Sequence, residues 1–271
     1  MGLLNYLVFD NINSSTYGVY IAGDGVFNAP ARRGEMVSIP GRNGSLFLDN
    51  GAYDNIEVEY PGFIGEGDEA QFRTKLTSFR SALASKTTYK RLEDTYHPDE
   101  FRLAIFRSGM EVDPQHYDRA GEFSILFDCK PQRFLKSGEI PQVFSANGTI
   151  LNPTLFESKP LIKVTGDGSV SIDPYRFTVT DNPGTIYIDS EIGEAYLPMG
   201  IEYDWTDESG YIITDDLNAP IQLVNGSDTV WSAAEFVSFE NSIMPMINAG
   251  SVSIGMTGTI SLEIIPRWWT L

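Results

Sequence analysis

The stretch most suggestive of chemistry is glycine-rich: residues 65–70 have the spacing G-x-G-x-x-A. Between a strand and a helix, such a turn binds the pyrophosphate of a dinucleotide. The preceding residues 56–60, however, alternate apolar and polar side chains, whereas the strand before such a turn is buried on both faces. Asp68 and Glu69 would also place negative charge beside the phosphates. We therefore expect no nucleotide cofactor.

Residues that could ligate a metal or act as a nucleophile are few. His97 and His116 are the only histidines, and neither lies in an H-E-x-x-H or Cys/His array. No serine stands in a G-x-S-x-G motif. Phe123, Ile125, Phe127 and Cys129 alternate with Ser124, Leu126 and Asp128, which predicts that the first four lie on the inward face of a strand. A buried thiol behaves as a small hydrophobic side chain, so we favour a core role for Cys129 over catalysis. As the only cysteine, it excludes an internal disulfide.

Carboxylates and tryptophans leave two alternatives open. The acidic residues between Asp204 and Asp216 lack the glycine and glutamate positions of an EF-hand, and we interpret them as solvated surface rather than a calcium loop or glycosidase pair. The tryptophans could stack on sugars or pack in a core or interface. A carbohydrate-binding module that attaches to a host cell wall is therefore the alternative function. The four tryptophans are Trp205, Trp231, Trp268 and Trp269.

Charge and hydropathy restrict the partners. The formal net charge is −18, and residues 141–271 hold 17 acidic and 4 basic side chains, a net of −13. A protein that grips DNA neutralises roughly 6 to 10 phosphates with Lys or Arg, so we expect no specific nucleic-acid binding. We expect no signal peptide and, because no run of about 18 apolar residues occurs, no membrane span. We expect a soluble protein.

The composition predicts a mostly β fold. Aromatic residues make up 12% of the chain, and 25 Gly and 15 Pro supply frequent turns. Turns are predicted at residues 40–44 and at Asn50-Gly51, the latter as a hairpin tip. Alternation and turn signals predict strands at 3–9, 17–21, 35–39, 45–48, 55–60, 87–92, 101–106, 121–130, 161–164, 169–172, 177–180, 185–189, 211–214, 221–224 and 259–265.

One segment breaks the β pattern. Phe72, Leu76, Phe79 and Leu83 recur at i, i+4, i+7 and i+11, which predicts an amphipathic helix whose first turn is capped by Asp68. Irregular residues 136–141 and the shift in charge predict a boundary between a domain of residues 1–138 and a domain of residues 139–271.

Several motifs resemble the distal tail protein (Dit) family of long-tailed bacteriophages, the siphoviruses. Residues 30–64 read PARRGEMVSIPGRNGSLFLDNGAYDNIEVEYPGFI, with a Pro-Gly-Arg-Asn-Gly turn and then Gly-x-Tyr-x-Asn. The predicted helix, GEFSILFDCKPQRF at 121–134 and ILNPTLFESKPLIKVTGDGSVSI at 150–172 follow in the family's order. The resemblance therefore covers essentially the whole chain.

The resemblance implies a fold and a role. The N-terminal domain would be a β-sandwich with one amphipathic helix and an extended hairpin that forms a hexameric ring, and the C-terminal domain a galectin-like β-sandwich. The protein would be a structural, non-enzymatic subunit without cofactor or metal. It would be made in the host cytoplasm and lie at the distal end of the phage tail in the virion. Its partners would be its own copies, in one ring or two stacked rings, the tail tube protein and a tail-tip or receptor-binding protein. The candidate contact residues are Arg32, Arg33, Arg42, Phe47, Asn50 and Gly51.

Overall fold

The computed structural model describes residues 4–23, 26–65, 68–110, 112–115, 120–197, 202–204, 222–224 and 231–271. The chain is mostly β, as predicted, and its described part contains one α-helix. It divides into two compact units: residues 1–135 with Leu271, and residues 136–270. We describe each unit by itself.

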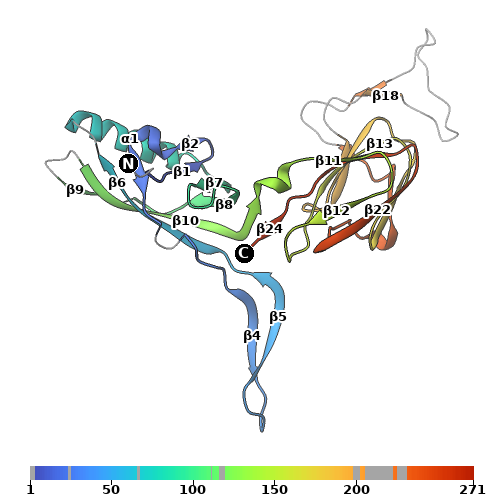
Figure 1. Ribbon diagram of the computed structural model, residues 1–271, viewed down its shortest axis with the longest axis horizontal. Coiled ribbons are helices and arrows are strands. Elements are labelled where there is room, and N and C mark those ends of the chain that lie inside the picture. The colour runs from blue at the N-terminus through green and yellow to red at the C-terminus, as the bar shows by residue number, and fades with distance from the viewer. Residues whose placement is uncertain are drawn as a thin grey trace. The chain divides into compact units, whose positions relative to one another are not determined.

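The N-terminal unit is built on one antiparallel sheet with strand order β2-β1-β7-β8-β10-β6-β3, and β9 also pairs with β10 (Figure 1). A separate two-stranded sheet is formed by β4 and β5. The elements are β1 (Leu7–Phe9), β2 (Ile12–Asn13), the 3-10 helix η1 (Ser14–Tyr17), β3 (Val19–Ile21), β4 (Arg32–Ser38), β5 (Ser45–Tyr53), β6 (Ile56–Gly65), α1 (Glu69–Ala84), β7 (Lys90–Asp94), β8 (Glu100–Phe106), β9 (Val112–Gln115) and β10 (Ala120–Leu135).

Strand β10 is the longest strand of this sheet and lies between β6 and β8. It pairs with β6 from Ala120↔Gly65 to Cys129↔Ile56, and with β8 on its other side. Successive side chains of a strand point to opposite faces. Accordingly Phe123, Ile125, Phe127 and Cys129 are all buried, and the inward face that the sequence predicts for them is confirmed. The strand is longer than the predicted 121–130, because it continues beyond a bulge between Cys129 and Arg133.

Helix α1 covers part of this core. It begins after Asp68, whose carboxylate accepts a hydrogen bond from the Gln71 amide at 3.4 Å, so the predicted cap is confirmed. Phe72, Phe79 and Leu83 are buried, while Leu76 is partly buried against the same cluster. The predicted apolar stripe is therefore the buried face of the helix.

The C-terminal unit consists mainly of two antiparallel sheets, with strand orders β11-β23-β13-β16-β17-β20 and β12-β22-β14-β15-β21. A short β18-β19 pair forms a third sheet. The elements are η2 (Lys136–Glu139), β11 (Gln142–Phe144), β12 (Gly148–Asn152), β13 (Leu161–Thr165), β14 (Gly168–Ile172), β15 (Tyr175–Val179), β16 (Thr185–Asp189), β17 (Glu194–Leu197), β18 (Glu202–Asp204), β19 (Gln222–Val224), β20 (Trp231–Ser232), β21 (Val237–Phe239), η3 (Glu240–Ser242), β22 (Gly250–Gly258), β23 (Ser261–Ile265) and β24 (Trp269–Thr270).

Each of the two large sheets of this unit has one buried face. On β13 and β23, Ile162 and Val164 pair with Ile264 and Leu262, and all four are buried. On the other sheet, Val170 of β14 pairs with buried Phe177 of β15. This alternation of buried and exposed positions fits a β-sandwich.

A partly buried ion pair ties the end of the C-terminal unit to strand β16. The Arg267 guanidinium donates two hydrogen bonds to the Asp189 carboxylate, at 2.6 and 2.9 Å. Burial would raise the pKa of Asp189, but the hydrogen bonds and charge of Arg267 outweigh it, and the pKa lies below its ordinary value. Because such a bidentate pair holds both groups in one orientation, it fixes the segment that precedes β24.

Some predicted features differ from the structure or lie outside the described residues. The strand predicted at 3–9 is confined to Leu7–Phe9 where it is described, and residues 14–17 of the N-terminal unit form a 3-10 helix. The sequence did not predict β2, β9, β11, β12, β17, β18, β20, β21, β22 and β24, since several are short or rich in Gly and Ser. Residues 211–214, Trp205, Asp216 and His116 lie outside the described part. Within that part, no helix is long and apolar enough to cross a membrane.

Cys129 provides a first test of the core. Burial raises the pKa of its thiol to about 12, from a usual value near 9.0, because the thiolate would be desolvated. Since the thiolate is the nucleophile, iodoacetamide should not label the folded protein at pH 8 but should label it in urea. The folded state holds this proton more tightly than the unfolded chain. The thiol's contribution to stability is therefore complete below pH 9 and declines as the pH rises towards 12. Rapid labelling without denaturant would contradict this burial.

Candidate functional site

The candidate functional site is the β4-β5 hairpin, which projects from the sheet of the N-terminal unit (Figure 1). Its register runs from Arg32↔Tyr53 at the base to Ser38↔Ser45 near the tip. No other strand pairs with either of its strands in the described part of the chain. Both outer edges of the hairpin therefore carry backbone groups without a strand partner, and such edges can pair with another chain.

Apolar side chains occupy both faces of the hairpin. Met36 and Phe47 are cross-strand partners on one face, and Leu46 and Leu48 lie on the other face, because neighbouring residues in a strand point to opposite sides. Their exposed fractions are 65% for Met36 and between 42% and 46% for the other three. None of them belongs to the hydrophobic core of the unit. The hairpin thus presents an apolar surface that its own unit does not cover.

Two arginines form ion pairs at the base of the hairpin. The Arg32 guanidinium donates to the Asp49 carboxylate at 2.6 Å and to the Tyr53 hydroxyl at 3.1 Å. Arg33 donates to the Asp54 carboxylate at 2.8 Å. The hydrogen bond to Tyr53 and the charge of Asp49 raise the pKa of Arg32. These exposed pairs contribute little stability by themselves, but they orient the two strands where they leave the sheet.

Asn50 and Gly51 do not form the tip of a hairpin, so that prediction is wrong. They lie within β5, where the register shifts: Arg33 pairs with Ala52, and Gly34 pairs with Asp49. The two residues form a β-bulge in the pairing of β4 with β5. Gly51 adopts a φ of +69°, a value that residues with a side chain rarely adopt. The Asn-Gly pair indicates a backbone position with positive φ, and such a position occurs in a bulge as well as in a hairpin turn.

The tip is the other predicted turn, residues 40–44. Gly41 and Gly44 both adopt a φ of +79°, and the Arg42 amide donates to the Ile39 carbonyl at 3.1 Å. Arg42 is exposed at this tip. The structure therefore places all six candidate contact residues on one hairpin: Arg32 and Arg33 at its base, Phe47 in its apolar part, Asn50 and Gly51 in its bulge, and Arg42 at its tip.

The pattern of the sequence underestimated the apolar part of this site. Phe47 was a candidate, whereas Met36, Leu46 and Leu48 were assigned only to strands. A signal was present, because the run Leu46-Phe47-Leu48 places apolar side chains on both faces of a strand that the neighbouring glycines and polar residues indicate to be exposed. A strand that is apolar on both faces needs cover on both faces.

The other candidates for chemistry are dispersed. His97 lies 3.1 Å from the Asp94 carboxylate through Nδ1, and its ring contacts Phe27. Trp268 is buried, and Trp269 stacks on Phe156 with ring centroids 4.3 Å apart. The structure does not describe the side chain of Trp231. Among the described residues, no group of three or more His, Cys, Asp or Glu side chains could hold a metal ion.

Comparison with known families finds a matching profile for part of the chain. Residues 12–129 match the family profile of the phage tail protein RIFT-related domain, a range that contains the whole hairpin and helix α1. This part of the chain is therefore similar to a domain of phage tail proteins. A search of curated protein sequences finds no match.

Solved structures narrow the resemblance. The chain is similar to the SPP1 Dit protein (gp 19.1), described as a paradigm of the hub adsorption apparatus in phages that infect Gram-positive hosts, with a TM-score of 0.68 and 11% identity over 99% of this chain and 100% of that one. It is also similar to chains of the phage P2 baseplate in its activated conformation with Ca and with Sr. Their TM-scores are 0.51 and 0.50 and their identities 10% and 9%, over 97% of this chain and 98% of each of those. The resemblance to siphovirus distal tail proteins is confirmed.

Gly34 allows a test of the hairpin's own packing. A Cβ atom at this position would overlap the Phe47 ring and lie 2.5 Å from the Leu48 carbonyl oxygen. Gly34→Val should therefore destabilise the hairpin by about 1–3 kcal/mol, as overpacking does, and speed amide exchange in β4 and β5 by roughly tenfold or more.

Gly65→Ala is the matched control, because Gly65 also lies in a strand but a Cβ atom there would have nothing within 4 Å. Hydrogen exchange followed by mass spectrometry measures both variants. Amide exchange in β10 should stay unchanged in both. Unchanged exchange in the hairpin of Gly34→Val would contradict the contact with Phe47.

Proposed function

We propose that this protein is a ring-forming structural subunit of a phage tail. Six copies form a closed ring through the domain of residues 1–138, at the distal end of the tail in the virion. The ring joins the tail tube to the host-adsorption apparatus, and the galectin-like domain of residues 139–271 takes no part in closing it. The role is structural rather than enzymatic. The observation that carries this proposal is the apolar hairpin without cover from its own unit.

The energetics of the hairpin favour a protein partner. An isolated two-stranded hairpin is marginally stable in water, and large exposed apolar patches mark interaction sites. Fully burying a Leu, Phe or Met side chain contributes about 1.5–3 kcal/mol. Because Leu46, Phe47 and Leu48 are already about half covered, docking would gain roughly 1 kcal/mol from each, and more from Met36. Such a gain suits a contact between subunits.

The symmetry of a ring explains why the partner would be another copy. In a cyclic ring every subunit contributes two different surfaces, one that reaches out and one that receives. A hairpin that projects from its sheet is suited to the first role, and its free edges could extend a sheet of the neighbour. Similarity to a hub protein and to baseplate chains is consistent with an oligomeric assembly in the tail.

The base of the hairpin would set its direction. The pairs Arg32 to Asp49 and Arg33 to Asp54 hold the first residues of β4 against the end of β5. The bulge at Asn50 and Gly51 increases the local twist just beyond them. The polar base and the bulge thus aim the apolar part of the hairpin, and Arg42 at its tip would reach furthest into the neighbour.

Mass in solution tests the proposal. Six subunits of 30.1 kDa give a ring of about 181 kDa, which light scattering coupled to size exclusion can distinguish from a monomer. Replacing Phe47 and Leu48 together by Glu would bury two unpaired charges in the contact, a large cost. The double variant should therefore elute as a monomer of 30.1 kDa.

Leu155→Glu serves as the control, since Leu155 is 91% exposed and lies in the C-terminal unit. It should leave the ring intact. A wild-type protein that stays monomeric at every concentration, or a hexamer that survives the double substitution, would overturn the proposal. Circular dichroism of the double variant excludes loss of folding as the cause.

A further inference from the structure

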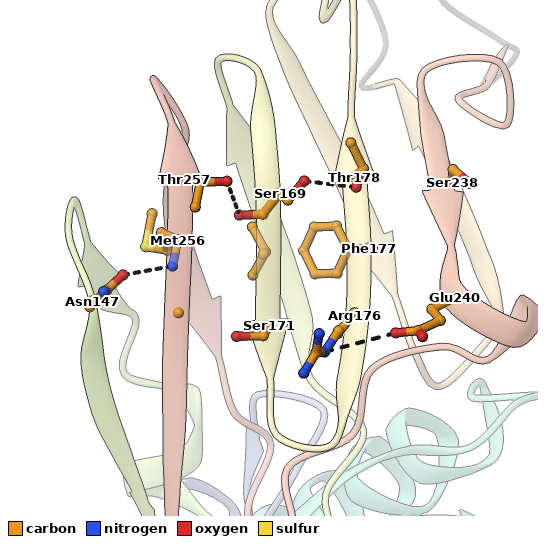
Figure 2. Close-up of a pocket in the computed structure, with 12 residues that line it drawn as sticks. Asn147, Ser169, Ser171, Arg176, Phe177, Thr178, Ser238, Glu240, Met256 and Thr257 are labelled. Carbon is orange, nitrogen blue, oxygen red and sulfur yellow. Dashed lines mark hydrogen bonds and ion pairs between the residues drawn. The ribbon is translucent and has the colours of Figure 1, made fainter.

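A groove lined by polar and apolar residues lies on the outer face of the sheet β12-β22-β14-β15-β21, on the C-terminal unit and apart from the hairpin. It has a volume of about 560 Å³, within the range of roughly 300–1,000 Å³ that is usual for ligand sites. Figure 2 shows Ser169, Ser171, Thr178 and Thr257 in the middle of the groove, with Asn147 on one side and Glu240 on the other.

The strand register arranges hydroxyl groups in a row across the groove. Thr257 of β22 pairs with Ser169 of β14, Ser169 pairs with Thr178 of β15, and Thr178 pairs with Ser238 of β21. The Ser169 and Thr178 hydroxyls are 2.9 Å apart. Neighbouring strands are about 4.8 Å apart, so the row extends across four strands for roughly 14 Å. Each hydroxyl can both donate and accept a hydrogen bond.

A second row across the same strands contains a charged residue, Arg176, and a residue without a side chain, Gly255. Gly255 pairs with Ser171, and Ser171 pairs with Arg176, whose guanidinium lies 3.8 Å from the Glu240 carboxylate. The backbone at Gly255 does not require glycine, because its φ is not in the left-handed region. A Cβ atom there would instead lie 2.5 Å from the Ser171 hydroxyl. A glycine of this kind in a strand marks a place where another group approaches closely.

The composition of the groove selects the class of ligand. Arg176 and Glu240 balance each other, and both side chains are exposed, at 70% and 58%, so they remain available to a ligand. An anionic ligand would meet Glu240 in a unit with a large excess of acidic residues. A peptide that adds a strand needs a sheet edge, whereas this groove lies on a sheet face. The remaining candidate is neutral and rich in hydroxyl groups.

We propose that this groove is a binding site for a neutral carbohydrate. The hydroxyl row and the Arg176 and Glu240 pair would exchange hydrogen bonds with sugar hydroxyls, and Gly255 would admit the ring. This function goes beyond ring formation and does not depend on it. It also differs from the tryptophan platform that the sequence suggested, because neither Trp268 nor Trp269 is among the described residues that line the groove.

Binding is tested with the full-length protein on an array of neutral hexose and N-acetylhexosamine oligosaccharides, with sialylated and sulfated ones for comparison. A neutral oligosaccharide that binds is then titrated by calorimetry. Thr178→Val removes one hydroxyl at constant shape, and Arg176→Ala removes the guanidinium. Each should weaken binding at least about tenfold, the effect of leaving a hydrogen-bonding partner of a sugar unpaired.

Thr149→Val is the matched control, because Thr149 is exposed on β12 of the same sheet but does not line the groove. It should bind as the wild type does, and all variants should keep the wild-type melting temperature. No binding to any neutral oligosaccharide, a preference for the anionic ones, or equal weakening by Thr149→Val would overturn the proposal. So would a groove whose variants impair only binding to another tail protein. Light scattering on the same samples reports ring formation separately.

Discussion

The constraint on which this molecule depends is that a strand with apolar side chains on both faces must be covered on both faces. Strand β10 meets it within the chain, because its buried residues Phe123, Ile125 and Phe127 lie on one face, in a core that α1 helps to close. The hairpin of β4 and β5 does not, because Met36 and Phe47 on one face and Leu46 and Leu48 on the other stay exposed. The cores of the two units are thus covered within the chain, whereas the apolar side chains of the hairpin are not.

The two units meet the demands of burial differently. In the N-terminal unit, a single sheet and one helix enclose aromatic residues such as Phe9, Tyr60 and Phe127, whose rings contact one another. The C-terminal unit relies on two sheets in which buried, mostly aliphatic residues alternate with more exposed ones. Because the buried residues all point to the inner face, side chains on the outer face of each sheet do not have to fill the core. That freedom is what allows small hydroxyl side chains to line a groove on β14, β15 and β22.

The sequence predicted features with a strong local cause. The spacing of Phe72, Phe79 and Leu83 specified a helix, and Asp68 specified its start. Alternation specified the buried face of β10. Local signals could not distinguish a bulge from a turn at Asn50-Gly51, because both require positive φ at the glycine. Strand β22 was not predicted, because Gly250, Gly255 and Gly258 interrupt the alternation of apolar and polar residues. The groove could not be predicted, because it depends on pairing between strands far apart in the chain.

The burial of Cys129 bears on how copies of the protein behave when they are crowded together. A chain with one cysteine can form disulfides only with other chains, and the thiolate is the species that starts such exchange. Here burial withholds both the sulfur and its negative charge from solvent. Subunits held side by side in an oxidising medium would therefore remain joined by noncovalent contacts alone, and could separate or shift without the reduction of any covalent cross-link.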